Sequence, residues 1–281
     1  MTIDRATFDA ARARHQTGAL EVVPGAIYVL GGVIPADGGV SWIPDGATGY
    51  QPANTYLVLG GEAPLIVDPG LPYVEPGLLS GLEEVLDAGT PVEVFLSRAQ
   101  LECIGNIGAI AARHPVTRVY TGGVRNPFDA FHTGTMRDRR SAGLNVRRAP
   151  EGSELEIIHA TLRLLNTYWG YHAPTGTLFT SDSFTHALMQ SIDAERVLHQ
   201  ESDDDTSPEQ VSAHLLATFP WLAGATTGPI SRSVTEVFSG RDVRVVAPAF
   251  GRVLVGRDVV ERHADLLIDA LNGAAELEVA A

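Results

Sequence analysis

The segment that decides the fold is Phe95-Leu96-Ser97-Arg98-Ala99-Gln100-Leu101-Glu102-Cys103-Ile104-Gly105-Asn106. Its beginning continues a mainly apolar run from Val92, with Glu93 as the exception, which predicts a short buried strand over 92–96. A polar loop follows, and the apolar stretch over 104–112 predicts a helix that opens at Gly-Asn. The segment therefore predicts a strand, a polar loop and a helix in immediate succession.

The same alternation of short buried strands with helices extends over most of the chain. Gly60-Gly61 separates two apolar runs and predicts a hairpin. Alternating strands and helices are typical of an α/β protein. The expected strands cover 26–30, 54–59, 64–67, 116–121, 155–165, 177–180 and 243–246, and the further helices cover 78–86, 209–219 and 259–271.

The chain is expected to form one main domain. Residues 1–20 are expected to be an N-terminal arm or short helix, and residues 21–281 a single domain. Residues 122–153 contain glycines, prolines and a cluster of arginines between Arg137 and Arg148, which predicts a long loop that covers the site. This cluster is compatible with an anionic ligand, a solvated surface or a contact between two copies of the chain, so a homodimer stays open.

Composition excludes several classes of function. All twenty basic residues are arginines, which excludes a P-loop, a Schiff-base enzyme and a lysine general base. With thirty-four acidic residues the formal net charge is −14, which argues against a nucleic-acid or anionic-membrane partner. No apolar run is long enough for a membrane span, and the N-terminus lacks the apolar region of a signal peptide. Arginine in place of lysine points to a bacterial protein, for which a cytoplasmic location is expected.

Motifs at the ends of the predicted strands occur in an order that resembles the metallo-β-lactamase superfamily. Among its members, Leu178–Phe184 and Thr167–Tyr171 are most similar to the β-lactamase-like half of flavodiiron and oxygen-binding di-iron proteins. The resemblance implies a four-layer αβ/βα sandwich with metals at one edge, between the two sheets. The motifs that carry it are 54–58, 65–70, 95–106, 178–182 and 246–251.

The residues at the family's metal-ligand positions differ in this chain. The family has His-x-His-x-Asp-His, or His-x-Glu-x-Asp in the di-iron variant, where the corresponding residues here are Arg98, Gln100, Glu102 and Cys103. A guanidinium stays protonated and has no lone pair to offer a cation. The resemblance implies that the bridging carboxylate is retained as Asp182. Phe250 stands where the family has its final histidine.

This ligand set predicts a degenerate site without iron, zinc or another cofactor. A stable metal site needs at least three nitrogen, carboxylate or thiolate ligands, and the resemblance leaves Glu102, Cys103 and Asp182. We expect Arg98 to supply part of the positive charge of the metals by pairing with Glu102 or Asp182. Arg98, Glu102 and Asp182 are therefore the candidate catalytic residues for metal-independent acid–base chemistry.

Further residues are candidates for contacts with a small-molecule ligand. Aromatic walls with a few polar groups are typical of such sites, and ordinary cores contain them almost as often. Cys103 is either a reactive thiol at a helix N-terminus or a small buried residue in a vacated ligand position. A rebuilt metal site would recruit His132, His172 or His186. The candidate ligand-binding residues are Gln100, Cys103, His132, Tyr168, Trp169, His186 and Phe250.

Most of the remaining titratable groups are expected to be structural. Asp68 follows a strand and precedes Pro-Gly, so its carboxylate is expected to accept backbone N–H groups in a turn. The other histidines fall on expected helix or surface positions, where they would be solvated or would cap helices. They are His15, His114, His199, His214 and His263.

Three functions are compatible with these residues, and the sequence does not decide whether the protein is an enzyme. The first is a metal-free protein of this fold that binds a small molecule or acts on it by acid–base chemistry. The second is a metal-dependent hydrolase or oxygen-reactive iron protein with a rebuilt ligand set. The third is a non-catalytic scaffold or regulatory dimer. Metal content separates the first from the second, and the effects of Asp182→Asn and Glu102→Gln separate the first from the third.

Overall fold

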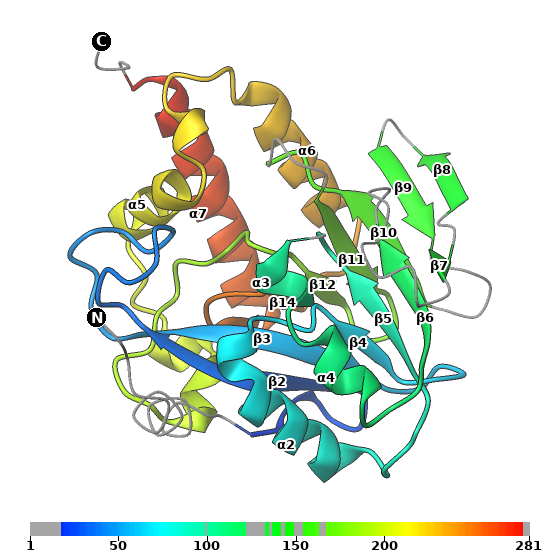
Figure 1. Ribbon diagram of the computed structural model, residues 1–281. Helices are drawn as coiled ribbons and strands as arrows, with labels where there is room; N and C mark the ends of the chain where they lie inside the picture. Colours follow the sequence, from blue (N-terminus) through cyan, green and yellow to red (C-terminus); the bar gives the residue numbers. More distant parts are fainter. Residues whose placement is uncertain are drawn as a thin grey trace.

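The computed structural model describes residues 18–98, 100–121, 133–134, 137–141, 144–148, 154–162 and 167–277. These residues form two β-sheets that pack face to face, with helices on the outer face of each sheet (Figure 1). The four-layer αβ/βα arrangement expected from the sequence is thereby confirmed. Within the described ranges, no helix is long and apolar enough to cross a membrane.

The first sheet is built mainly from the N-terminal half of the chain. Its strands follow the order β1 to β7, and the neighbours β1–β4 are antiparallel whereas β4–β7 are parallel. Because β4, β5 and β6 are parallel, their carboxyl ends lie at one edge of the sheet. The strands are β1 (Leu20–Val23), β2 (Ile27–Pro35), β3 (Tyr50–Val58), β4 (Leu65–Val67), β5 (Val92–Leu96), β6 (Val116–Thr121) and β7 (Thr133–Gly134).

The second sheet has the order β13-β15-β14-β12-β11-β10-β9-β8. Most neighbours are antiparallel, but β12 pairs in parallel with β14, and β13 with β15. The pair β12–β14 places the residues after both strands at the same edge. The strands are β8 (Arg137–Ser141), β9 (Leu144–Arg148), β10 (Leu155–His159), β11 (Tyr168–His172), β12 (Thr177–Phe179), β13 (Leu198–His199), β14 (Val245–Ala247) and β15 (Val253–Val255).

Three hydrophobic cores separate the four layers. The helices α2 (Glu75–Val85), α3 (Leu101–Ile104) and α4 (Ile107–Ala111) cover the first sheet. The helices α5 (Pro208–Thr218), α6 (Gly228–Ser239) and α7 (Arg257–Ala275) cover the second. The third core, between the sheets, contains Tyr56, Phe95 and Phe179. Because side chains alternate along a strand, neighbouring residues of one strand contribute to different cores.

The sequence missed α6 and misjudged part of the segment 122–153. Helix α6 begins with Gly-Pro and is rich in serine and threonine, so only its buried positions Ile230, Val234 and Val237 mark it as amphipathic. Residues 122–153 were expected to form a loop, which is wrong for β7, β8 and β9. The strands β8 and β9 form a hairpin at the edge of the second sheet, and their arginine-rich sequence hides the period-2 pattern.

Close packing fixes the loop after β5 against the turn after β4. Asn106 donates hydrogen bonds of 2.8 Å from Nδ2 to the carbonyl oxygens of both Pro69 and Leu71. At Gly105, a Cβ atom would lie 2.4 Å from the ring of Pro72, so a larger residue would force the two segments apart. The Gly-Asn pair at the start of the predicted helix therefore positions the loop on which the candidate site residues lie.

Candidate functional site

The polar residues that follow β4, β5 and β12 meet at one edge, between the two sheets. Asp68 follows β4, Ser97 and Arg98 follow β5, and Ser181 and Asp182 follow β12. Ser97 Oγ lies 2.8 Å from Ser181 Oγ, which directly joins the two sheets. Carboxyl ends of strands are the usual place for a binding site in α/β folds.

Asp68 anchors this edge. Its Oδ1 accepts the backbone N–H of Ser97 at 2.8 Å, and its Oδ2 accepts the Ser97 hydroxyl at 2.6 Å. Asp68 thus accepts a backbone N–H group as expected, but this group belongs to the loop after β5 and not to the Pro-Gly turn after β4. Burial raises the pKa of Asp68 to about 6, although the Ser97 hydrogen bonds and the charge of Arg98 act in the opposite direction. Asp68 and Ser181 both have left-handed φ angles, of 50° and 55°, which are sparsely populated conformations found mainly at functional sites.

Arg98 is buried at the centre of the edge and its guanidinium has two partners. Nη1 forms an ion pair with Asp182 Oδ2, and the two side chains are only 4% and 5% exposed. Nε donates to Cys103 Sγ at 3.2 Å. Of the two carboxylates considered as partners, the structure selects Asp182. The guanidinium thus lies among the residues that correspond to family ligand positions.

Cys103 is fully buried, which favours one of the two interpretations of this residue. Burial raises its pKa to about 12, and the nearby Arg98 only partly offsets this effect. Both features are those of a small buried side chain, and an activated nucleophile would have a lowered pKa.

In native protein at pH 8, Cys103 is expected to react with iodoacetamide at least about a thousandfold more slowly than a free thiol, since its thiolate fraction is so small. Mass spectrometry of the alkylated chain against time measures the rate. The same protein in concentrated urea is the control and should label completely. Labelling of native protein at the rate of a free thiol would contradict this assignment.

The other two residues of the loop differ in their surroundings. Glu102, in α3, is half-buried, and within the described ranges it forms no ion pair; its charge raises the pKa of Arg98 while burial lowers it. Gln100 Oε1 is buried and has no hydrogen-bond partner in the described part of the chain. The ligand atoms of Glu102, Cys103 and Asp182 do not lie together as a chelating group. The structure therefore provides a cation–carboxylate pair and not the three-ligand set left over from the motif.

An aromatic pair lies in and beside the loop after β14, and this loop contacts the edge through a 2.6 Å hydrogen bond from Ala249 N–H to Ser181 O. Phe250 is buried, and its ring centroid lies 5.3 Å from that of Trp42. Asn54 holds the turn around Phe250, since its Nδ2 donates to the carbonyl oxygens of Pro248 and Gly251. Phe250, which stands where the family has its final histidine, is thus held in a fixed position.

The structure does not bring all of the predicted ligand-binding residues together. Tyr168 lies in the core between the sheets, and its backbone N–H donates to Ser97 O at 2.8 Å. Trp169 lies on the other face of the second sheet, where its ring centroid is 6.3 Å from that of Phe184. His132 lies outside the described residues. His186 is buried beside α7, where its ring stacks on His263.

The expectation that four of the remaining histidines are solvated or cap helices is wrong. Each is at most 2% exposed. His214 and His263 lie on helices, as expected, whereas His199 lies in β13 and His114 in the bend after α4; packing against other elements buries all four. They are His114, His199, His214 and His263. His15 lies outside the described residues.

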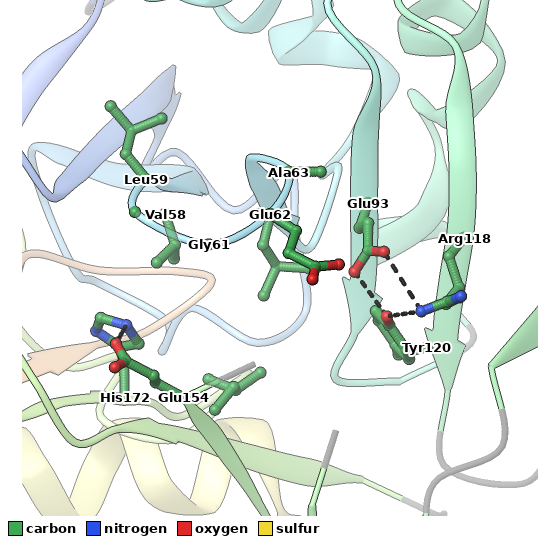
Figure 2. Close-up of a pocket in the computed structure, with 13 residues that line it drawn as sticks. Val58, Leu59, Gly61, Glu62, Ala63, Glu93, Arg118, Tyr120, Glu154 and His172 are labelled. Atoms are coloured by element: carbon green, nitrogen blue, oxygen red, sulfur yellow. Dashed lines mark hydrogen bonds and ion pairs between the residues drawn. The ribbon is translucent and has the colours of Figure 1, made fainter. Parts of the chain in front are cut away.

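Figure 2 shows a cavity of about 130 Å³ at the opposite edge, at the amino ends of β5 and β6. Glu93 accepts a 2.6 Å hydrogen bond from the Tyr120 hydroxyl, and Arg118 lies beside both. His172 and Glu154 face them from the second sheet. No motif points to this cavity, because its lining comes from segments far apart in the sequence. A smaller cavity, of about 10 Å³, lies between the loop after β12 and α5, where Asp182, His186 and His214 are among the residues that line it; it has room for about one water molecule.

Comparison with solved structures identifies the fold. Residues 1–254 of a diflavin flavoprotein A 5 from Nostoc sp. PCC 7120 match with a TM-score of 0.65 and 16% sequence identity, over 92% of this chain and 96% of that one. The chain has the metallo-β-lactamase fold. Rubredoxin oxygen:oxidoreductase from Desulfovibrio gigas matches with a TM-score of 0.60 and 16% identity over 92% of this chain. The match covers 61% of that protein, so the chain spans about three fifths of its length.

A third metallo-β-lactamase-fold neighbour is a chemotaxis sensor ODP whose structure shows a peroxy diiron species. It matches with a TM-score of 0.56 and 16% identity, over 92% of this chain and 95% of that one. No protein-family sequence model matches the chain, and no curated protein sequence does. At these identities the similarity establishes the fold alone, and the activity has to be argued from the residues at the edge.

Proposed function

We propose that this chain is a metallo-β-lactamase-fold protein whose site at the Arg98 edge works without a metal and binds a small molecule. The observation that carries the proposal is the buried ion pair between Arg98 and Asp182, with Nε of Arg98 on the Cys103 sulfur. A cation that shares the position of the family's ligands both neutralises the retained carboxylate and repels a second cation.

The residues of this edge do not fit the diiron centre that the neighbouring structures suggest. One carboxylate is already paired with a guanidinium, and burial keeps the thiol of Cys103 protonated with a pKa of about 12. A metal ligand has to present a lone pair, which the guanidinium lacks and the protonated thiol offers only weakly. We therefore derive no step through iron or zinc at this position.

Arg98 has one nitrogen left for a ligand. Nε and Nη1 are bonded to Cys103 and Asp182, whereas Nη2 forms no hydrogen bond in the described part of the chain. A guanidinium N–H in buried surroundings favours a carboxylate, phosphate or polarised carbonyl oxygen. The ligand class supported best is thus a small molecule with such an oxygen.

Acid–base chemistry is an extension of this binding function. Glu102 is half-buried next to Arg98 and has no ion-pair partner among the described residues, so it is free to exchange a proton with a ligand held there. Arg98 would stabilise negative charge that develops on the ligand oxygen. Asp182 would hold the guanidinium in place as its ion-pair partner. Glu102→Gln should then abolish turnover while binding persists.

The test of the metal-free site compares wild type with Cys103→Ser, a variant that preserves size and removes the strongest potential metal ligand. Both untagged proteins are incubated with Fe²⁺ without oxygen, and separately with Zn²⁺, then desalted and analysed by mass spectrometry for metal. We expect equal metal content in the two proteins. A loss of one or more equivalents in Cys103→Ser would contradict the proposal.

Small-molecule binding is tested by titrating wild type and Glu102→Gln with inorganic phosphate and with acetate. Changes in the NMR chemical shifts of backbone amides report the binding. We expect tighter anion binding in Glu102→Gln, because this change removes a negative charge near Arg98. The exposed substitution Glu83→Gln is the control for a change of net charge alone. If neither anion shifts the signals of residues around Arg98, the small-molecule site is not there.

A further inference from the structure

A second cluster of polar side chains lies away from the Arg98 edge, on the helix side of the second sheet. His199 lies in β13, Asp204 in the loop before α5, and His263 in α7. The side chains are 2%, 6% and 0% exposed. One ligand-type atom from each lies within 4.8 Å of those from the other two. Three separate elements therefore direct nitrogen and oxygen atoms to one buried point.

The orientation of the side chains in this cluster, and not the distances alone, favours a common ion over hydrogen bonds. His199 Nε2 lies 3.0 Å from Asp204 Oδ1, and His263 Nε2 lies 3.2 Å from the same oxygen. Both nitrogens are nevertheless buried without a hydrogen-bond partner among the described residues, so their N–H directions miss the oxygen. Ligand atoms on a tetrahedral zinc with bonds of about 2.0–2.1 Å are about 3.3 Å apart, close to the spacings seen here.

The surrounding residues hold these side chains in position. His263 Nδ1 lies 2.8 Å from Nε2 of His186, and the two rings stack. In the tautomer in which His263 donates to His186, its Nε2 presents a lone pair to the cluster. Arg262 Nη1 donates to Asp204 Oδ2 at 2.5 Å, but the Arg262 side chain is 45% exposed, so water screens its charge, unlike that of the buried Arg98. The Thr206 N–H donates to Asp204 Oδ1 at 3.2 Å. Such contacts orient metal ligands in known sites, where removing one weakens metal binding.

We propose that His199, Asp204 and His263 form a binding site for one divalent transition-metal ion of the zinc class. Two imidazoles and one carboxylate suit Zn²⁺ and its neighbours, whereas Mg²⁺ and Ca²⁺ prefer all-oxygen sites. The ion joins β13, the loop over 200–207 and α7, and its fourth ligand is water. It stabilises the helix side of the second sheet, and it is independent of the Arg98 edge.

The first experiment uses untagged full-length wild type stripped with a chelator and titrated with Zn²⁺ or Co²⁺. We expect one equivalent of metal per chain and a higher melting temperature in the presence of Zn²⁺. The Co²⁺ protein should show visible bands of a four-coordinate nitrogen and oxygen site, without a sulfur-to-cobalt charge-transfer band. Absence of binding by both ions would overturn the proposal, because the cluster would then be a set of buried histidines around one carboxylate.

The second experiment assigns the ion to these residues. Asp204→Asn and His199→Gln should each lose the bound equivalent, and His186→Gln should weaken Zn²⁺ affinity about 10–100-fold as a positioning residue. His172→Gln and Cys103→Ser are the controls and should keep it. Far-UV circular dichroism at low temperature establishes that each variant is folded. If either Asp204→Asn or His199→Gln does not fold, the other variant alone carries the test. Retention of metal in both ligand variants would contradict this site, and loss in Cys103→Ser would instead contradict the metal-free Arg98 edge.

Discussion

Replacing Asp182 by alanine is expected to lower the free energy of unfolding by about 3–5 kcal/mol. The change removes the ion-pair partner of the Arg98 guanidinium, which is 4% exposed in the wild type, and leaves the Cys103 sulfur as its hydrogen-bond partner. Arg98→Met should cost a similar amount, because it removes the cation that forms an ion pair with the buried Asp182 carboxylate. Urea denaturation at pH 7.5, read by circular dichroism and by tryptophan fluorescence, measures both effects.

The double variant Arg98→Met/Asp182→Ala separates pairing from packing. Removing both charges avoids the cost of an unpaired buried ion, so the double variant should be more stable than the sum of the single effects by at least about 1.5 kcal/mol. The pair Arg113 and Glu83 is the matched control, because its side chains are 44% and 64% exposed at 3.2 Å. Arg113→Met and Glu83→Gln should change stability by less than about 1 kcal/mol. Additive effects at Arg98 and Asp182 would contradict a coupled buried pair.

Local patterns predicted the layers of this fold because each element carries its own signal. The run over 92–96 is apolar at four of its five positions, as is typical of a strand covered on both faces, and Gly60-Gly61 marks the hairpin between β3 and β4. Where the pattern is weak, the prediction failed. Helix α6 begins with Gly-Pro, and the hairpin of β8 and β9 consists largely of arginines. Tertiary contacts override local preference at these places.

The candidate site was partly predictable, because some of its residues lie at strand ends that the sequence marks. Arg98 and Asp182 occupy motif positions at strand ends, so their meeting follows from the resemblance once the strands are placed. The cluster of His199, Asp204 and His263 follows from no motif, because its residues come from separate elements. The stacking of His263 on His186, 77 residues away in the chain, is likewise invisible in the sequence. A histidine on a helix looks the same in sequence whether its face is solvated or packed. The one available signal was the apolar spacing around His214 and His263, which places both on buried helix faces.

Buried His214 is expected to make stability strongly dependent on pH below neutrality. It lies in α5 beside Val211 and Leu215, and Nδ1 has no hydrogen-bond partner in the ranges that the structure describes. Burial lowers its pKa to about 4 from the model-peptide value of 6.5. The native state therefore binds this proton less tightly than the unfolded state does. The stability from neutral His214 is fully present above pH 6.5 and is lost as the pH falls towards 4.

The variant His214→Leu isolates this contribution. Over pH 7.5 to 4.5 the wild type should lose about 2.5 kcal/mol more than the variant, since a pKa unit corresponds to about 1.4 kcal/mol. His186 and His263 also have lowered pKa values through burial and titrate in both proteins. The variant also removes the charge by which His214 lowers the pKa of His186, which adds to the difference in the same direction. Ala213→Leu, at an exposed position of the same helix, controls for helix propensity and should keep the wild-type pH dependence. Equal pH dependence of the unfolding free energy in wild type and His214→Leu would contradict the lowered pKa of His214 in the folded protein.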